Sequence, residues 1–454
     1  MIMKRSLFFL LLFYAGLNVS KSFGQNYPTK WSLEECIEYA LNHNIQLRQS
    51  RLSKSQAEAE YEQSRSALFP TLSASTNQNV SWRPFSEQTV SLSNGTFTST
   101  SNEVSYNGSY GINANWTVWN GGINRQNIKK YALSGEIAEQ NILSTSNDIQ
   151  EQIVQYYVQI IYLDEAVNVN KNILESSKIQ RDRAREMVDV GSLAKADLAQ
   201  MEAQVSQDEY NVVNSEVQLA STKLQLKQLL QLVQLENFDI EIPNIDDSDV
   251  LSPLPSLSSV YNTSLTYRPE IEKAKLNHES SKLDLNIAKR GYYPTVSLMA
   301  GIGTSNNSVS DDAIFNQLKN NLNNTIGLSV SVPIFDGKQN HTNVVKAQLA
   351  EENSQLELLN AEQELYSKIE TYWLNAKNAQ QQYIYAKSNL TSNEASYELL
   401  DAQFDVGLKN IAELLTGKNN LIQAKQQVLQ SKYTALLNLS LLRFYQGYGM
   451  ELKN

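Results

Sequence analysis

The sequence of 454 residues has little of what most enzymes and metalloproteins depend on. It contains one cysteine, so no intrachain disulfide can form. Cys36 falls on the apolar side of a helical pattern, which is typical of a small core residue. The three histidines, His43, His278 and His341, are far apart, and none has a second histidine or a cysteine at zinc-site spacing. We find no nucleophile-and-base motif and no glycine-rich phosphate loop. The sequence therefore predicts no catalytic residue, no metal site and no cofactor.

Positive charge and long apolar runs are also scarce. The formal net charge is -10, whereas nucleic-acid-binding proteins usually carry a basic surface, so we expect no nucleic acid partner. No internal run reaches the roughly 20 apolar residues that a membrane-spanning helix needs. A transmembrane β-barrel is compatible with this composition, because barrel strands alternate between apolar and polar residues.

The first 24 residues have the layout of a secretory signal peptide. Two basic residues, Lys4 and Arg5, precede a short apolar run over 7–17, and small residues follow it. The run is too short to span a bilayer well, so we expect cleavage near Gly24 rather than a membrane anchor. No cysteine lies at this point, and we therefore expect no lipid anchor at the new N-terminus.

The rest of the chain repeats the same landmarks twice. Val190-Gly191 matches Val406-Gly407 at a shift of 216 positions. The same shift relates the segment 119–121 (Trp-Asn-Gly) to the segment 335–337 (Phe-Asp-Gly), and each half has an aromatic-Pro-Thr step, at 69–71 and 293–295. A shift that is kept at several landmarks indicates a duplication with a pseudo-twofold arrangement.

This duplication sets the expected domain boundaries. Each repeat has the order helix, strand, polar loop, strand and two very long helices. Between the repeats lies an acidic stretch with three prolines, which we expect to be an extended or loosely packed linker. The expected boundaries are 1–24 for the signal peptide, 25–235 for the first repeat, 236–260 for the linker and 261–454 for the second repeat.

The strands alternate as membrane strands do. Over Val104–Val118, apolar and polar residues alternate for about fifteen residues, more than the roughly 9–11 that a tilted strand needs to cross a bilayer. The second half repeats this pattern over 325–334, and further alternations follow Pro70 and Pro294. The polar face carries almost no charge, and the loops over 83–102 and 305–323 are rich in Ser, Thr and Asn, as in outer-membrane barrels. A soluble sandwich with one wet face would give the same alternation.

About four strands do not close a barrel, and an open sheet edge is not stable in lipid. A barrel in this chain therefore requires oligomerisation. A dimer would give about eight strands, whose interior fills with side chains, and a trimer about twelve, which leaves room for a pore. If the molecule is a conduit, a trimer is the smallest assembly that we expect to work. Trp82, Trp116 and Trp119 lie near the expected strand ends, where interfacial aromatic residues belong.

Two stretches predict long helical hairpins. Apolar residues step by three and four over Ile149–Leu174 and, at the same shift of 216, over Leu365–Leu390, which is the pattern of supercoiled helices. The returning helices carry an apolar residue every seven positions, over Leu198–Leu226 and Leu414–Leu442. A helix of roughly 65 residues is about 100 Å long, which is more than a globular domain needs. The core of an ordinary bundle gives a similar stripe, but the length, the duplication and the attached strands favour a coiled coil.

Two β-hairpins that lead into two long helical hairpins, in one duplicated secreted chain, resemble the TolC-like outer-membrane efflux proteins. The resemblance covers nearly all of the mature chain. It extends to short motifs at 31–35 (Trp-Ser-Leu-Glu-Glu), 40–44 (Ala-Leu-Asn-His-Asn) and 268–270 (Arg-Pro-Glu), to the aromatic-Pro-Thr steps and to the paired Val-Gly turns. One departure is Ile45, where the family often has proline.

The resemblance implies a membrane β-barrel plus an α-helical coiled-coil barrel. It implies a homotrimer with a twelve-stranded barrel in the outer membrane of a Gram-negative bacterium and a helical tunnel across the periplasm. The implied partners are a periplasmic adaptor (membrane fusion) protein and an inner-membrane pump. The implied function is a passive conduit for small molecules or proteins in a tripartite efflux or type I secretion system, and not an enzyme.

The candidate functional residues lie at the turns of the two hairpins. Glycine permits a tight interhelical turn in any case, and the resemblance adds contact with the adaptor. The docking candidates are Val190, Gly191, Ser192, Leu193, Val406, Gly407 and Leu408.

Three charged residues follow the turns closely. Asp197 and Glu413 are equivalent at the shift of 216, and in a trimer they would form an acidic ring that favours cations at the tunnel entrance. Lys409 is placed to bridge to Asp197 of the neighbouring hairpin and to hold the mouth closed. Solvated surface charges would show the same pattern.

Three other classes of protein are alternatives to a channel. A periplasmic adaptor, or another coiled-coil interaction protein, would show one helical hairpin and a lipoyl-like β-domain. A soluble periplasmic enzyme would need a polar site with a base or a metal. A structural coiled-coil protein would leave the alternating strands unexplained.

Overall fold

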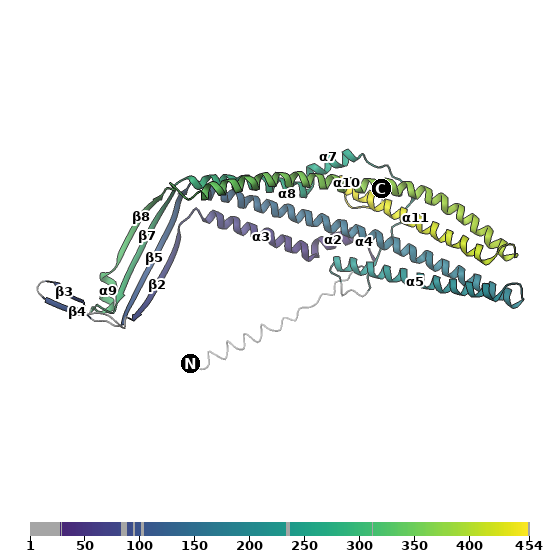
Figure 1. The fold of residues 1–454 in the computed structure, drawn as a ribbon, viewed down its shortest axis with the longest axis horizontal. Helices are drawn as coiled ribbons and strands as arrows, with labels where there is room; N and C mark the ends of the chain where they lie inside the picture. Colours follow the sequence, from purple (N-terminus) through teal and green to yellow (C-terminus); the bar gives the residue numbers. More distant parts are fainter. Residues whose placement is uncertain are drawn as a thin grey trace, which may run out of the picture.

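The computed structural model describes residue 28 and residues 30–82, 89–93, 96–100, 104–232, 237–310 and 312–452, with backbone only for 89–93 and 96–100. The expected signal peptide over 1–24 lies outside the described residues. The molecule is elongated. A small sheet lies at one end, and long helices run from it to two tight turns at the other end (Figure 1).

The two halves contain the same elements in the same order. Helices α4 (Ile123–Asp189) and α10 (Gln339–Asp405) are both 67 residues long. Helices α5 (Lys195–Leu229) and α11 (Ile411–Tyr445) are both 35 residues long. Both pairs are related by the shift of 216 positions that the sequence predicts. Before the sheet strands, the first half has α2 (Leu33–His43) and α3 (Ile45–Ser66), and the second has α7 (Leu257–Tyr267) and α8 (Pro269–Lys289).

The returning helices are about half as long as α4 and α10, so the prediction of two very long helices per half was wrong. Their seven-residue apolar pattern itself ends at Leu226 and Leu442, close to the ends of α5 and α11. Each long helix changes partner along its length. The half near the sheet packs against α3 or α8, and the half near the turns packs against α5 or α11 (Figure 1).

None of the helices in the described part of the chain combines the length and the apolar composition needed to cross a membrane.

The sheet has four antiparallel strands in the order β2-β5-β7-β8. Each half contributes one hairpin, and the two hairpins meet where β5 pairs with β7. The outer strands β2 and β8 each have one edge that no strand of this sheet pairs. The strands are β2 (Thr71–Trp82), β5 (Val104–Asn120), β7 (Thr295–Asn307) and β8 (Asn323–Ser331).

The structure differs from the expected strands and loops in three places. Strand β8 ends at Ser331, two residues before Pro333, so the strand expected up to residue 334 was too long; proline has no N–H for the ladder. The loop expected over 83–102 contains a two-stranded ribbon, β3 (Thr89–Ser93) and β4 (Thr96–Thr100). The loop expected over 305–323 contains a short helix, α9 (Ile314–Asn320).

The junctions between strands and long helices have a left-handed backbone. Gly121 and Gly122 have φ of 67° and 81°, and Gly337 has φ of 63°. Glycine adopts this conformation without the steric cost of a Cβ. The fourth residue with positive φ here is Lys338, at 71°. These turns aim the sheet away from the helix axis, as Figure 1 shows.

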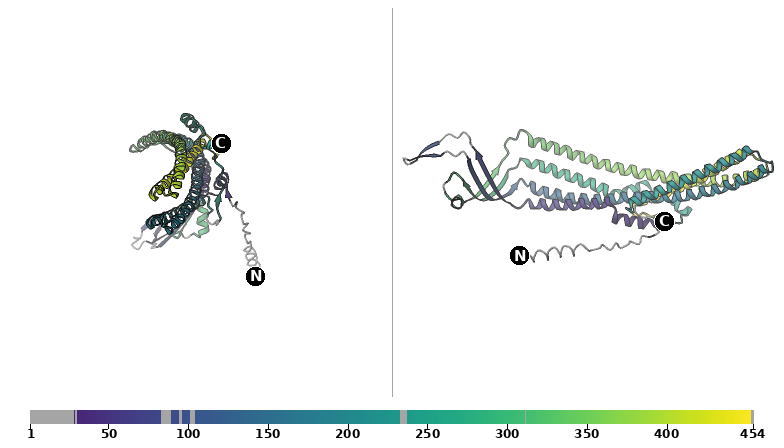
Figure 2. Two further views of the ribbon diagram at one scale, coloured as in Figure 1. Left: turned by 90° about the vertical axis from the view of Figure 1, so that its right-hand side faces the viewer. Right: turned by 90° about the horizontal axis from the view of Figure 1, so that it is seen from below.

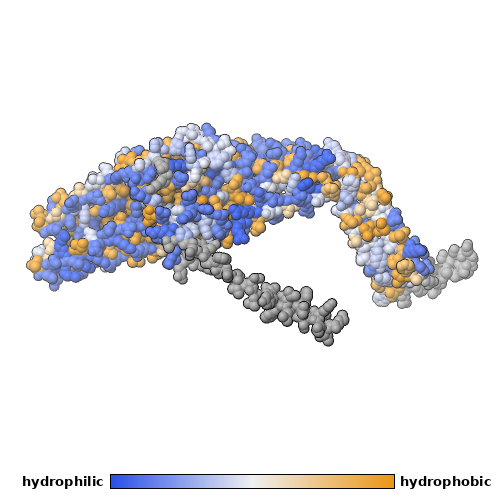
Figure 3. Space-filling model, turned by 180° about the vertical axis from the view of Figure 1, so that it is seen from behind, coloured by the Kyte–Doolittle hydropathy of each residue, from blue (hydrophilic) through white to orange (hydrophobic). Residues whose placement is uncertain are grey.

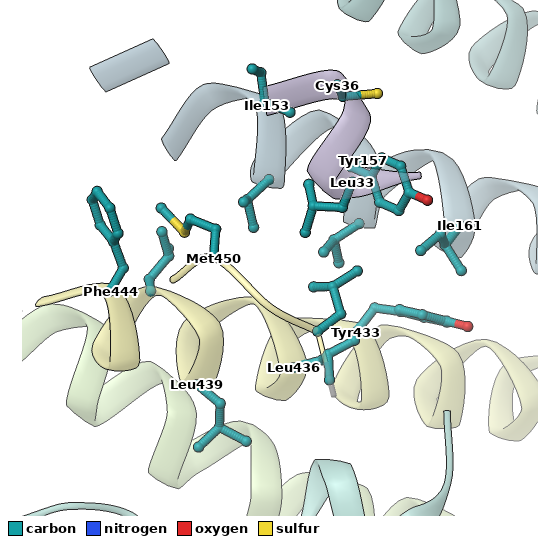
Figure 4. Close-up of a cluster of buried hydrophobic side chains, with 14 of the residues drawn as sticks. Leu33, Cys36, Ile153, Tyr157, Ile161, Tyr433, Leu436, Leu439, Phe444 and Met450 are labelled. Atoms are coloured by element: carbon teal, nitrogen blue, oxygen red, sulfur yellow. The ribbon is translucent and has the colours of Figure 1, made fainter. Parts of the chain in front are cut away.

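The main core lies at mid-length of the helices, where α2, α4 and α11 meet. Cys36 is fully buried there, as the sequence predicts, and burial raises the pKa of its thiol to about 12. Figure 4 shows Cys36 and Tyr157 with side chains of α11 around the same cluster. The Tyr157 hydroxyl donates to the backbone oxygens of Trp31 (3.2 Å) and Glu241 (2.5 Å), so this core also holds the N-terminal strand and the chain between the halves.

The segment between the halves is closely packed, and the expectation of an extended or loose linker was wrong. Strand β6 (Asp239–Ile240) pairs in parallel with β1 (Lys30–Trp31), and α6 (Asp247–Val250) follows. Ile240 and Val250 are at most 1% exposed. Apolar side chains among the acidic ones allow this segment to join the core, which its prolines and charges alone did not indicate.

Candidate functional site

The two helical turns have the same backbone geometry. Gly191 and Gly407 have φ of 77° and 76°. The next N–H groups reach back five residues, from Ser192 to the Met187 oxygen (2.8 Å) and from Leu408 to the Gln403 oxygen (2.9 Å). This is a Schellman ending, in which a left-handed residue closes the helix and satisfies its last carbonyl groups. Equal turns at the ends of equal helices place both tips at the same level of the molecule (Figure 1).

Apolar side chains project from these turns. Val190, Val406 and Leu408 are 79%, 69% and 74% exposed, so a partner that covered them would remove apolar surface from water. Leu193, also among the predicted docking residues, instead packs partly against the tip core described next. The turns therefore present a small apolar surface made of three of the seven predicted residues.

A second, smaller core joins the two hairpins just above the turns. Ala184 and Met201 come from the first hairpin, and Phe404, Ile411 and Leu414 come from the second. All five side chains are buried. We refer to these five residues as the tip core. The two hairpins are therefore packed against each other at the end where the chain turns.

The predicted entrance charges are only partly brought together. Lys409 Nζ lies 2.6 Å from Glu413 Oε1, one helical turn further on. Glu413 also completes a capping box with Asn410 at the start of α11. Lys409, and then the backbone N–H of Asn410, lower the pKa of the Glu413 carboxyl.

Asp197 lies in the equivalent first turn of α5 and is half-buried. Within the described residues of this single chain, Lys409 pairs with Glu413 and forms no ion pair with Asp197. The bridge from Lys409 to Asp197 of a neighbouring hairpin therefore stays a prediction about the assembled protein.

Polar contacts between α4 and α10 lie beside the tip core, and the sequence analysis did not identify them. Gln180 Nε2 donates to Asp401 Oδ1 (3.0 Å) and to the Tyr397 hydroxyl. Arg183 Nη1 lies 2.7 Å from Asp405 Oδ1. The signal was present in the sequence, because Tyr397, Asp401 and Asp405 are spaced by four and therefore share one helix face.

The sheet exposes large apolar side chains at the other end of the molecule. In β8, Ile326, Leu328 and Val330 are 82%, 68% and 58% exposed. They alternate with polar residues, as predicted, and apolar side chains gather over this end in the space-filling view (Figure 3). An apolar strand face of this size, on a sheet with free edges, is unsuited to contact with water.

The helices also expose apolar residues at heptad-like spacing. Leu349 and Leu356 lie seven residues apart on α10, and Tyr210 and Val217 lie seven apart on α5; all four are exposed. Viewed along the long axis, the helices follow an arc that is open on one side (Figure 2). Exposed seams on the flanks of an open arc are typical of a subunit that packs against other copies.

A family model of outer membrane efflux proteins matches residues 36–231 and 260–447. The chain belongs to the outer membrane efflux protein family. This membership confirms the predicted resemblance and places the protein in the outer membrane. The two matched segments correspond to the two halves seen in the structure.

Family relatives agree with this assignment. "Outer membrane protein TolC" of Salmonella enteritidis is 22% identical over 302 residues, which cover 64% of this chain and 59% of that protein. The match thus spans less than two thirds of the TolC length. "Proteases secretion protein PrtF" of Dickeya chrysanthemi is 20% identical and covers 91% of this chain and 88% of that protein.

Solved structures of efflux channels share the fold. The Campylobacter jejuni CmeC outer membrane channel superposes with a TM-score of 0.75 at 20% identity, covering 92% of this chain and 86% of that chain. At this identity the likeness concerns the arrangement of sheet and helices. The architecture of a sheet joined to long helical hairpins is therefore that of outer-membrane channels.

Proposed function

We propose that this protein is the outer-membrane channel subunit of a tripartite efflux or type I secretion system and serves as a passive conduit for exported small molecules or proteins. The observation that carries the proposal is that one chain contains both an open sheet and an open arc of helices, and neither closes on itself. A four-stranded sheet with an exposed apolar face is continuous with an open arc of helices. Each is completed by the same operation, the addition of further copies.

The sheet supports a trimer with a twelve-stranded barrel. In lipid, the N–H and C=O groups along the free edges of β2 and β8 need partners, because water is absent. Pairing β8 of one copy with β2 of the next satisfies both edges. Three copies of four strands give twelve, which leaves a pore, whereas two copies give eight, whose interior fills with side chains.

The helices support a tunnel of the same symmetry. Each α4 and α10 has 67 residues and is therefore about 100 Å long at 1.5 Å per residue. Three arcs placed side by side would bury the exposed seams on α5 and α10 and enclose a tube. The tube continues the barrel, because both are built from the same three copies.

The tips support contact with a periplasmic adaptor, which in turn engages an inner-membrane pump. Val190, Val406 and Leu408 are exposed apolar residues at the far end from the sheet, and a helical partner would bury them. Asp197 and Glu413 would form the acidic ring at the entrance.

The test is to isolate the outer-membrane fraction, extract it in mild detergent and measure the mass of the native complex. The proposal expects a trimer that forms conducting pores in planar lipid bilayers. A soluble periplasmic monomer would overturn it. An adaptor, the alternative interpretation, would be recovered with the inner membrane and would not conduct.

A further inference from the structure

A buried ion pair connects the two helical hairpins above the tip core. Lys418 of α11 and Asp208 of α5 lie 3.4 Å apart between Nζ and Oδ2, and their side chains are 4% and 2% exposed. Arg183 and Asp405, which also join the hairpins, are both more than a third exposed. Lysine and aspartate are rarely buried to this extent, so the pair needs a physical explanation.

The site is built from three helices. Ser177 of α4 donates to Asp208 Oδ2 and accepts from Lys418 Nζ. Gln204 Nε2 donates to Asp208 Oδ1 at 2.9 Å. Burial lowers the pKa of Lys418, and the nearby carboxylate of Asp208 acts in the opposite direction. Both carboxylate oxygens of Asp208 thus accept hydrogen bonds inside the first hairpin. The Lys418 ammonium has Ser177 and Asp208 as partners only while α11 is seated against α4 and α5.

The neighbouring packing shows that α11 is seated closely in its own hairpin. Gly417 precedes Lys418 in the middle of a helix, where glycine is unfavourable relative to alanine. A Cβ at Gly417 would lie 2.5 Å from Leu400 Cδ1 of α10. The glycine thus allows α10 and α11 to approach while the next residue points into the first hairpin.

A buried ion pair differs from an apolar contact in how it responds to separation. Taking two charges out of water costs free energy that their attraction largely offsets, so a well-packed apolar replacement is often as stable or more stable. When the hairpins separate, water solvates both charges again, whereas apolar side chains lose favourable burial. If one hairpin slides along the other, each charge stays buried but loses its partner, which is strongly unfavourable.

We propose that the Lys418–Asp208 pair is a switch element with two effects. It fixes the axial register in which the two hairpins pack against each other, and it lowers the free energy needed to separate them. The inference rests on the proposed channel function and adds to it that separation of the two hairpins opens the tunnel entrance. On this inference the pair holds the hairpins together less strongly than an apolar contact in the same place would. The two hairpins therefore pack in one defined register near the turns, but little free energy is needed to separate them.

The test compares four variants of the full-length protein with the wild type. Lys418→Met and Asp208→Asn each leave one buried partner unmatched. The double variant Lys418→Met/Asp208→Leu replaces the pair with apolar side chains. The matched control is Lys178→Met/Glu209→Gln, which removes an ion pair at the adjacent positions; that pair is exposed and lies within one hairpin, at 3.4 Å.

Two readouts are measured on each variant. The first is the open probability of single channels in planar bilayers. The second is hydrogen exchange of the segment 411–425 in the purified protein, which reports separation of the hairpins without requiring conduction. We expect both single variants to open at least tenfold more often and to exchange faster. We expect the apolar double variant to open less often than wild type and to exchange more slowly, and the control to match wild type.

The outcomes separate this inference from the channel proposal. If the double variant opens as often as the single variants, the ion pair stabilises the packed hairpins more than apolar side chains do, and the inference is overturned. If all variants exchange and conduct as wild type does, the pair has no role in opening and the inference also fails. If no variant conducts, wild type included, the channel proposal fails, and slower exchange in the double variant would still support the energetic role of the pair.

Discussion

Asn124 and Asn340 stand 216 positions apart and make the same contact. Asn124 Nδ2 donates to the backbone oxygen of Ala67 at 3.2 Å, and Asn340 Nδ2 donates to that of Gly291 at 3.0 Å. In each half, the first turn of a long helix thus holds the end of the shorter helix that precedes the sheet. The two junctions between strands and helices are therefore held in the same way.

Removing either amide should destabilise its junction. We expect Asn340→Ala to lower the free energy of unfolding by about 1 kcal/mol, since a half-buried backbone oxygen loses its partner. Asn124→Ala should lower it by less, because the bond to Ala67 is exposed. The two effects should add, because the sites are separate. Thermal unfolding of the purified protein measures the change. Asn353→Ala, which removes an exposed bond to Glu357, is the control, and equal shifts in all three variants would contradict the assignment.

A charge on the apolar face of β8 should block assembly in the membrane. Ile326 is 82% exposed on that face, and a lysine near the bilayer midplane costs about 2–4 kcal/mol. We expect Ile326→Lys to reduce the folded protein in the outer membrane. Thr325→Lys places the same charge on the opposite face of the same strand and should fold normally. If the two variants fold equally well, the apolar face does not contact lipid.

The acidic residues at the tips should make the entrance favour cations. We expect Asp197→Asn combined with Glu413→Gln to shift the reversal potential in a KCl gradient toward zero, since the charges of the ring are lost. Lys409 lowers the pKa of the Glu413 carboxyl, which favours its charged form. Glu60→Gln, on α3 near the sheet, is the control. Unchanged selectivity in the double variant would rule out the ring.

The polar contact between α4 and α10 should limit opening of the tips. Arg183 pairs with Asp405 across the hairpins at 2.7 Å, and both side chains are more than a third exposed. Exposed pairs contribute about 1 kcal/mol or less, so we expect Arg183→Ala to raise the open probability only a few-fold. Arg185→Ala breaks a pair with Glu202 inside one hairpin and should have no effect. A similar increase in both variants would point to a general loss of stability.

The chain around Asp247, in the segment between the halves, should become less protected in acid. Lys387 and then the Tyr383 hydroxyl lower the pKa of Asp247, which they hold against α10. A carboxylate with a lowered pKa contributes stability above its usual pKa and loses that contribution as the pH falls through the lowered value. We expect protection of residues 245–256 in hydrogen exchange, corrected for intrinsic rates, to fall over this range. Asp247→Asn should remove the pH dependence, and a wild-type response in that variant would contradict it.

Much of the architecture follows from local patterns along the chain. Alternation with a period of two identified strand β5, because successive side chains of a strand point to opposite faces. Apolar steps of three and four identified α4 and α10, and the glycines at 191 and 407 marked their turns, because the left-handed conformation there favours glycine. These features depend on neighbours in sequence, so the sequence alone determined them, and the duplication confirmed each one a second time.

The tertiary structure decided which distant residues share a partner. A heptad stripe does not distinguish whether α4 packs against α3 or α5, and both helices use it in turn. The close packing of the segment between the halves also depended on the folded arrangement. The burial of Lys418 against Asp208 depended on it as well, because a lysine in a helical pattern is predicted to be exposed unless another hairpin covers it. The reason is the same in each case. Local periodicity defines which face of an element is apolar, and only the packing of whole elements determines what lies opposite that face.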